Sequence, residues 1–150
     1  MPAGSAIPYD GYFNASPECW SVFTEVLGRE FSGGALFGQL QHLTAEAYAV
    51  QHPGGPHHDK SIGLHLAGLY LMVERGIPPA SVAPYMQKLA ERVREWPHLD
   101  PPPPDIWTQT IFDVAMAGDH IAAVREWSAG VWEAWSPQRD RVTALLESLD

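Results

Sequence analysis

The stretch QHLTAEAYAVQHPGGPHHDKSIGLH, residues 41–65, holds five of the seven histidines of the chain. Its pattern predicts the end of one buried helix, a loop rich in proline and glycine over 52–59, and the start of a second buried helix. Helices joined by so short a loop pack antiparallel as neighbours. We therefore expect a helical hairpin, with helices over about 35–51 and 60–75, at the centre of the fold.

Both helices of this hairpin are unusually apolar. The first has no lysine or arginine and a single acid, Glu46, while the interior of the second has His65 as its one strongly polar side chain besides Tyr70. A helix that is apolar nearly all round is usually central in a fold. The small residues Gly63 and Gly68 in the second helix predict close approach of a neighbouring backbone.

Signals for further helices lie on both sides of the hairpin, and strand alternation and internal repeats are lacking. Caps of serine, threonine and aspartate, with prolines in first turns, mark the helix starts. The predicted helices begin near Pro17, Ala35, Lys60, Ser81, Ile111, His120 and Pro137. We expect one all-α domain over residues 16–150, a compact bundle of about six helices, after an N-terminal arm over 1–15. The proline-rich segment 96–105 is interpreted as a stiff strap within this domain.

Charge and composition exclude several classes of partner. The formal net charge is -9, whereas nucleic acids and anionic membrane surfaces attract proteins through lysine and arginine. The single cysteine, Cys19, makes a disulfide framework within the chain impossible, and the first residues lack the basic start and apolar run of a signal peptide. We therefore expect a soluble cytoplasmic protein that binds neither nucleic acid nor membranes.

The hairpin geometry brings three polar side chains together. Glu46 lies five residues before the end of the first helix, and His65 lies about five residues after the start of the second. At ~1.5 Å per residue both side chains lie ~8 Å from the loop, so they face each other at one level. His42 is one helical turn from Glu46 on the same face. These residues are candidate metal ligands, and Glu46 and His65 are also candidate acid–base groups.

Two interpretations of these three residues stay open. A buried histidine in an apolar helix is most often a neutral core residue with a hydrogen-bonded partner, and Glu46 with His65 fits that description. The other interpretation is a divalent metal with nitrogen and oxygen ligands, for which zinc, iron, nickel and manganese are all suitable.

The remaining histidines of the stretch differ in context. His57 and His58 stand beside Asp59 in the loop and are expected to be solvated. His52 precedes Pro53, which holds its backbone out of the helix, so it either caps the helix or points into a cleft as a general acid or base. Cys19 stands near a helix N-terminus, but a nucleophilic thiolate needs a base that the sequence does not reveal, so we treat it as a small buried residue.

A tryptophan-rich helix over 120–135 is the other unusual element. Trp127 and Trp132 lie on different faces of this helix, and Arg125 shares the face of Trp132. Tryptophans there are usually core, but one beside an arginine could line an apolar pocket for a carboxylate. His120, at the start of the helix, is expected to be exposed. The candidate substrate-binding residues are Tyr48, Gln51, Arg125, Trp127 and Trp132.

Three segments together resemble a bacterial family of small proteins known only as a domain of unknown function. They are SPECWSVFTEVLGREFS (16–32), QHLTAEAYAVQHPG (41–54) and HIAAVREWSAGVWEAW (120–135), and the similarity runs from about Tyr9 to Trp135. The QHPG element and REWSAGVWEAW are its most specific parts. Many members of that family carry a Cys-x-x-Cys pair ahead of the first helix, and this chain has no such pair before Tyr9. If that pair binds zinc, a metal here would need the histidines instead.

A weaker likeness is architectural. Small helical bundles with a histidine cluster at a metal, such as the DinB-like group, are similar to the expected arrangement, although a fold does not fix a function. No serine-hydrolase elbow, phosphate loop or HExxH motif is present.

The first functional hypothesis is a small enzyme, with or without a divalent metal, acting on a small organic molecule in a pocket between the hairpin and the 120–135 helix. In it His52 would be a proton shuttle beside Glu46 and His65. The alternative is a non-enzymatic module that binds a small molecule or forms a homodimer, with the Glu46–His65 pair purely structural.

Overall fold

The computed structural model describes residues 13–32 and 40–149. These residues hold seven α-helices and no β-strand, so the all-α prediction is confirmed. The helices are α1 (Pro17–Ser32), α2 (Gln41–Gln51), α3 (Asp59–Val73), α4 (Ala83–Arg92), α5 (Ile111–Met116), α6 (His120–Trp135) and α7 (Arg139–Glu147). Short 3-10 turns cover Pro79–Ser81, Pro104–Ile106 and Ser136–Gln138.

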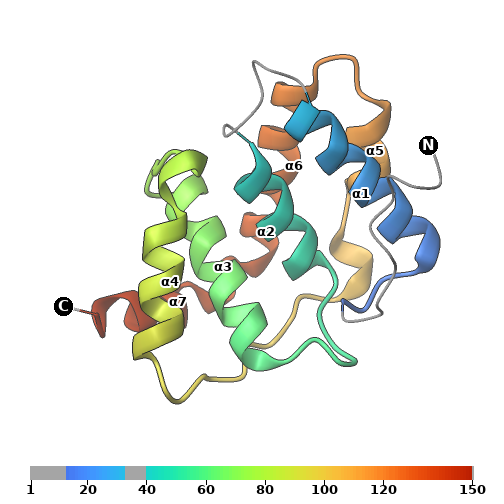
Figure 1. The fold of residues 1–150 in the computed structure, drawn as a ribbon. Helices are drawn as coiled ribbons and strands as arrows, with labels where there is room; N and C mark the ends of the chain where they lie inside the picture. Colours follow the sequence, from blue (N-terminus) through green and yellow to red (C-terminus); the bar gives the residue numbers. More distant parts are fainter. Residues whose placement is uncertain (1–12, 33–39, 150) are drawn as a thin grey trace.

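Helices α2 and α3 form an antiparallel hairpin at the centre of the bundle (Figure 1). Helix α2 packs most extensively against α3 and then against α6, and it also touches α1. Its apolar residues Ala47 and Val50 are completely buried, as the apolar composition predicts. The expected start of this helix at Ala35 lies outside the described residues.

The predicted caps at Ser16, Thr110 and Asp119 are present in the structure, whereas α7 begins at Arg139 after the 3-10 turn Ser136–Gln138 and has no side-chain cap. The backbone N–H of Cys19 donates to Ser16 Oγ over 3.1 Å, and that of Ala122 donates to Asp119 Oδ1 over 3.1 Å. Thr110 and Asp113 form the expected capping box of α5. Each cap satisfies a backbone donor that the first helical turn leaves without a partner, so local sequence fixes where these helices begin.

Helix α3 is closely approached at both of its glycines, but by side chains rather than by a neighbouring backbone, so that detail of the prediction was wrong. A Cβ atom on Gly63 would lie 2.7 Å from the Trp96 ring, and one on Gly68 would lie 2.8 Å from the sulfur of Met86. Trp96 opens the proline-rich segment 96–105, which therefore rests on α3 through its aromatic ring.

The tryptophan-rich helix α6 packs on α2 through indole hydrogen bonds. Trp127 Nε1 donates to Gln51 Oε1 over 3.0 Å, and Trp135 Nε1 donates to the carbonyl of Val50 over 2.9 Å. Both indoles are buried, and their N–H groups need such partners. Among the helices that the structure describes, none combines the length and apolar character that crossing a membrane requires.

Candidate active site on the central hairpin

A single buried carboxylate joins the two helices of the hairpin. Glu46, on α2, is only 2 % exposed, and each of its oxygens faces an imidazole. His65 Nδ1, on α3, lies 2.9 Å from Oε1, and His42 Nδ1, one turn earlier on α2, lies 3.0 Å from Oε2. The structure therefore brings together the three residues that the helical spacing places at one level.

The hydrogen bonds to Glu46 determine which ring nitrogen of His42 and of His65 carries the donated hydrogen. A carboxylate only accepts, so each imidazole donates through Nδ1–H and, when neutral, carries its lone pair on Nε2. The hydrogen bond with Glu46 raises the pKa of His42 above its ordinary value, although partial burial opposes this. Both side chains are partly exposed, His42 more than His65.

A metal could use the Nε2 atoms of His42 and His65, with Glu46 orienting the rings from behind in the manner of a carboxylate–histidine–metal arrangement. In that case Glu46 would not be a direct ligand, because both of its oxygens accept hydrogen bonds from the imidazoles. Within residues 13–32 and 40–149, no group of three or more His, Cys, Asp or Glu side chains is placed to hold a metal ion. A third ligand would therefore have to come from elsewhere.

A thiol and an imidazole meet on the other side of α2. Cys19 Sγ, near the start of α1, lies 3.3 Å from His52 Nε2, at the end of α2. The other ring nitrogen of His52, Nδ1, lies 2.8 Å from the carbonyl of Tyr48, to which it donates. This bond fixes the tautomer and leaves the Nε2 lone pair directed at the thiol. The phenol of Tyr48 donates to Cys19 Sγ over 3.5 Å.

Burial keeps both members of the Cys19–His52 pair neutral at physiological pH. Cys19 is 8 % exposed, and burial raises the pKa of its thiol, although the hydrogen bond from Tyr48 acts in the opposite direction. Burial likewise lowers the pKa of His52. The pair is therefore a thiol beside an unprotonated base.

This pairing was not predicted from the sequence, in which Cys19 was interpreted as a small buried residue. The restricted His52–Pro53 backbone and the position of Cys19 near a helix N-terminus were the available signals. Neither signal reveals that α1 packs against the end of α2, which is what brings the thiol to the imidazole.

An aromatic cluster connects the thiol pair with the histidine–carboxylate group. The ring centroid of Phe13 lies 6.0 Å from those of Trp20, Tyr48 and His65, and 4.7 Å from that of His57. Tyr48 is also stacked on Phe23 of α1 at 3.9 Å. Both polar groups thus border one apolar cluster, which lowers the local dielectric and strengthens the hydrogen bonds beside it.

His57 is buried, so the expectation that it is solvated was wrong. It is 4 % exposed, donates through Nδ1 to the carbonyl of His52 over 3.0 Å, and accepts from Ser61 Oγ at Nε2 over 2.7 Å. Burial lowers its pKa to about 4. His58 is exposed as expected and caps α3, its Nδ1 accepting from the Ser61 backbone over 3.4 Å.

A second buried carboxylate ties α1 to α6. Glu30 is 0 % exposed and accepts from Thr44 Oγ1 over 2.6 Å and from His120 Nε2 over 2.8 Å. Burial raises the pKa of Glu30, and both of these hydrogen bonds oppose that rise. His120 is therefore largely buried and paired, contrary to the expectation of exposure.

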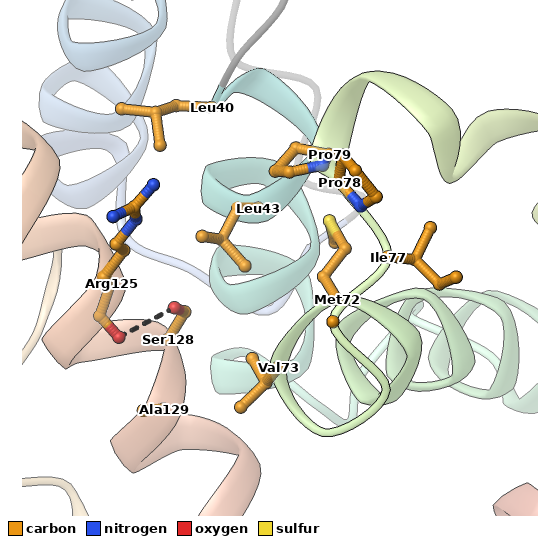
Figure 2. Close-up of a pocket in the computed structure, with 11 residues that line it drawn as sticks. Leu40, Leu43, Met72, Val73, Ile77, Pro78, Pro79, Arg125, Ser128 and Ala129 are labelled. Atoms are coloured by element: carbon orange, nitrogen blue, oxygen red, sulfur yellow. Dashed lines mark hydrogen bonds between the residues drawn. The ribbon is translucent and has the colours of Figure 1, made fainter.

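A cavity of about 470 Å³ lies between α2, α3 and α6 (Figure 2). It is lined by Leu40, Leu43, Met72, Val73, Gly76, Ile77, Pro78, Pro79, Arg125, Ser128 and Ala129. These lining residues include Arg125, as expected, but neither the histidines nor Glu46. The pocket and the histidine cluster, which the sequence analysis combined into one site, are therefore two separate places.

The other candidate substrate-binding residues lie away from this cavity. Tyr48 is completely buried between α1 and α2, and Gln51 joins α2 to α6, donating through Nε2 to the carbonyl of Gln109 over 2.6 Å and accepting from Trp127. Trp132 donates to Glu74 Oε1 over 3.4 Å and packs on Tyr70, so it does not share a pocket with Arg125.

No curated protein and no solved structure matches this chain. One family model does match, over residues 4–136, and it is described as a family of unknown function, DUF5946. The match includes residues 16–32, 41–54 and 120–135, which carry the resemblance seen in the sequence. Since it spans most of the chain, the protein belongs to the family of unknown function DUF5946.

Proposed function

We propose that the protein is a small enzyme that uses Cys19 as a nucleophile and His52 as its general base on a small organic ester or thioester. The observation that carries the proposal is the 3.3 Å contact between Sγ and Nε2, with the carbonyl of Tyr48 holding the other nitrogen. A nucleophile within reach of a base that a third group orients is the arrangement on which covalent acyl transfer depends.

The proposed step follows from these contacts. Sγ attacks the carbonyl carbon of the substrate, a C–S bond forms, and the thiol proton moves to Nε2 of His52. The bond from that carbon to the leaving oxygen or sulfur then breaks, and the leaving group takes the proton from Nε2. Water then attacks the acyl carbon and loses a proton to Nε2. The C–S bond breaks, Sγ takes the proton from Nε2, and the carboxylic acid leaves.

The phenol of Tyr48 would assist this step. Its hydrogen bond to Sγ favours the charged form of the sulfur, and the Tyr48 ring is fixed by stacking on Phe23. Because both members of the pair are neutral at rest, the thiolate would form only as His52 takes the proton during attack. General-base assistance of this kind is typically worth about 10²–10⁴-fold in rate.

The test uses 4-nitrophenyl acetate as the acyl donor and intact-mass spectrometry to detect acetyl-Cys19. We expect acylation of the wild-type protein, none in Cys19→Ala, and a rate about 10²-fold lower in His52→Asn. His98→Asn is the matched control. His98 is an exposed histidine in the proline-rich segment 96–105, and it pairs with Asp59 at the start of α3. Equal acylation rates in wild type and His52→Asn, or acylation only at the rate of global unfolding, would show that His52 is not a base for Cys19.

A second candidate function is divalent-metal chemistry at His42 and His65. It is supported by the arrangement in which one buried carboxylate holds both Nδ1–H groups and leaves both Nε2 lone pairs outward. Zinc, iron, nickel and manganese all accept imidazole ligands. Catalytic zinc sites use three protein ligands, so this candidate requires one more donor than these two histidines supply.

Metal analysis of protein purified without chelator tests this candidate. Stoichiometric metal in the wild type and in His98→Asn, together with its loss in folded His65→Asn, supports a metal site. Metal-free wild-type protein that also shows no saturable zinc binding by calorimetry excludes it.

A further inference from the structure

The cavity between α2, α3 and α6 is independent of the thiol and histidine groups. We infer that it is a binding site for a small apolar monocarboxylate, whose alkyl chain lies along the apolar walls and whose carboxylate pairs with Arg125. The inference rests on the volume of the cavity, on the restricted backbone of part of its wall and on the charge at its edge.

The size and lining of the cavity suit a small organic ligand. Its volume of about 470 Å³ lies within the ~300–1,000 Å³ that is typical of ligand pockets, which combine mostly apolar walls with a few polar groups. Leu40 and Leu43 form one wall, and Met72 and Val73 form another (Figure 2). An alkyl chain placed between these two walls would be shielded from water on both of its sides.

Part of the cavity wall has a restricted backbone. Gly76, three residues after the last residue of α3, has a φ of +72°, a left-handed conformation that suits glycine. The chain then turns back, and Pro78 and Pro79 stand over the cavity opposite α6 (Figure 2). Two adjacent prolines restrict the backbone, so little conformational freedom remains to be lost when a ligand enters.

The positive charge of Arg125 favours a ligand that carries a carboxylate. Of the eleven residues that line the cavity, Arg125 is the one that is charged. No ion pair or hydrogen bond of its guanidinium group is found within the described part of the chain, although the chain has 18 acidic residues against nine basic ones. Figure 2 shows this group reaching from α6 toward Leu40. A guanidinium can bind a carboxylate through two parallel hydrogen bonds.

The site does not depend on the proposed enzyme activity. Cys19, His52 and Glu46 are not among the residues that line the cavity. A ligand here would be a substrate, an effector or a stored metabolite, and the same binding experiment detects all three.

Calorimetric titration with butanoate, hexanoate and octanoate, and with the alcohols of the same chain lengths, tests the inference. We expect saturable binding of the carboxylates, with affinity rising about fourfold per added methylene while the walls can still cover it. Each alcohol should bind at least about tenfold more weakly than its carboxylate.

Two variants separate the apolar and the charged contributions. Arg125→Gln should weaken carboxylate binding at least about tenfold and leave alcohol binding unchanged, whereas Ala129→Phe should fill the cavity and remove binding of both. Arg94→Gln, an exposed arginine outside this cavity, is the matched control, and circular dichroism checks that each variant is folded.

Three results would each overturn the inference. They are no saturable binding of octanoate to folded wild-type protein, equal affinity for carboxylate and alcohol, and equal carboxylate affinity in Arg125→Gln and Arg94→Gln. Cys19→Ala should bind octanoate as the wild type does, so failure of the thiol mechanism and failure of this site are distinguishable.

Discussion

The Nε2 atom of His52 faces the Sγ atom of Cys19 across 3.3 Å, although 33 positions separate the two residues in the chain. The contact exists because α1 begins beside the point where α2 ends. The carbonyl of Tyr48, in the last turn of α2, accepts from Nδ1 of His52 and so selects the tautomer whose Nε2 lone pair faces the thiol.

The ionisation of Cys19 should report its burial. We expect the thiolate absorbance of the folded protein to appear at higher pH than that of the unfolded chain, because burial raises the pKa of Cys19. In Tyr48→Phe the thiolate absorbance should appear at still higher pH, because this change removes the hydrogen bond that lowers the pKa of Cys19. The stabilisation from this group is present below the ordinary thiol pKa and is lost as pH rises through the folded-state value. Thiolate absorbance in the wild-type protein at neutral pH would contradict this prediction.

Replacing Glu46 with glutamine should change the titration of His42. The carboxylate raises the pKa of His42, so in Glu46→Gln the NMR titration midpoint of His42 should fall toward its ordinary value. The stability that this pair contributes is fully present below the ordinary histidine pKa and is lost as pH rises through the raised one. His98→Asn is the matched control variant, because His98 pairs with Asp59 instead, and it should leave the His42 midpoint unchanged. An unchanged midpoint for His42 in Glu46→Gln would mean that Glu46 does not hold it in solution.

Acidification should destabilise the fold through His57. Burial lowers its pKa to about 4 from an ordinary value of 6.5, so the unfolded chain binds this proton more tightly than the folded chain does. The stabilisation is complete above pH 6.5 and is lost as pH falls toward 4, by up to about 3 kcal/mol. Urea unfolding across this window measures it, and His57→Gln should flatten the pH dependence. Wild type and His57→Gln losing stability in parallel would assign the effect to other groups.

Gly63 and Gly28 should respond in opposite directions to alanine. A Cβ atom at Gly63 would meet the Trp96 ring at 2.7 Å, so Gly63→Ala should lower the free energy of unfolding by about 1–3 kcal/mol. A Cβ atom at Gly28 of α1 meets nothing within 4 Å, so Gly28→Ala should raise the free energy of unfolding by up to about 1 kcal/mol. Thermal unfolding of both variants decides this, and an equally stable Gly63→Ala would show that Trp96 moves aside freely.

Features that depend on near neighbours in the chain were predictable from the sequence. The caps at Ser16 and Asp119 involve residues three positions apart, and the structure has them as predicted. The contact between Glu46 and His65 follows from helix rise and a short loop, because the two residues are placed symmetrically about the turn.

Features that depend on how distant helices pack were not predictable. Glu30 and His120 lie 90 positions apart, and nothing in either segment reveals the other as a partner. His57 stands in a polar, glycine-rich loop whose composition indicates solvent, but the carbonyl of His52 and the hydroxyl of Ser61 satisfy both of its ring nitrogens and allow burial. The separation of the Arg125 cavity from the histidines likewise depends on which face of α2 meets which neighbour.

The short length of α2 has a consequence for how the molecule acquires its chemistry. Helix α2 spans 11 residues, and an isolated helix shorter than about 12–15 residues is marginal in water. It is therefore helical because α1, α3 and α6 pack around it. It carries Glu46 and the wall residue Leu43, and it places His52 directly after its last residue. The reactive groups should therefore assemble in the same cooperative event that completes the bundle, and a partly folded intermediate should carry an inert thiol and an open cavity.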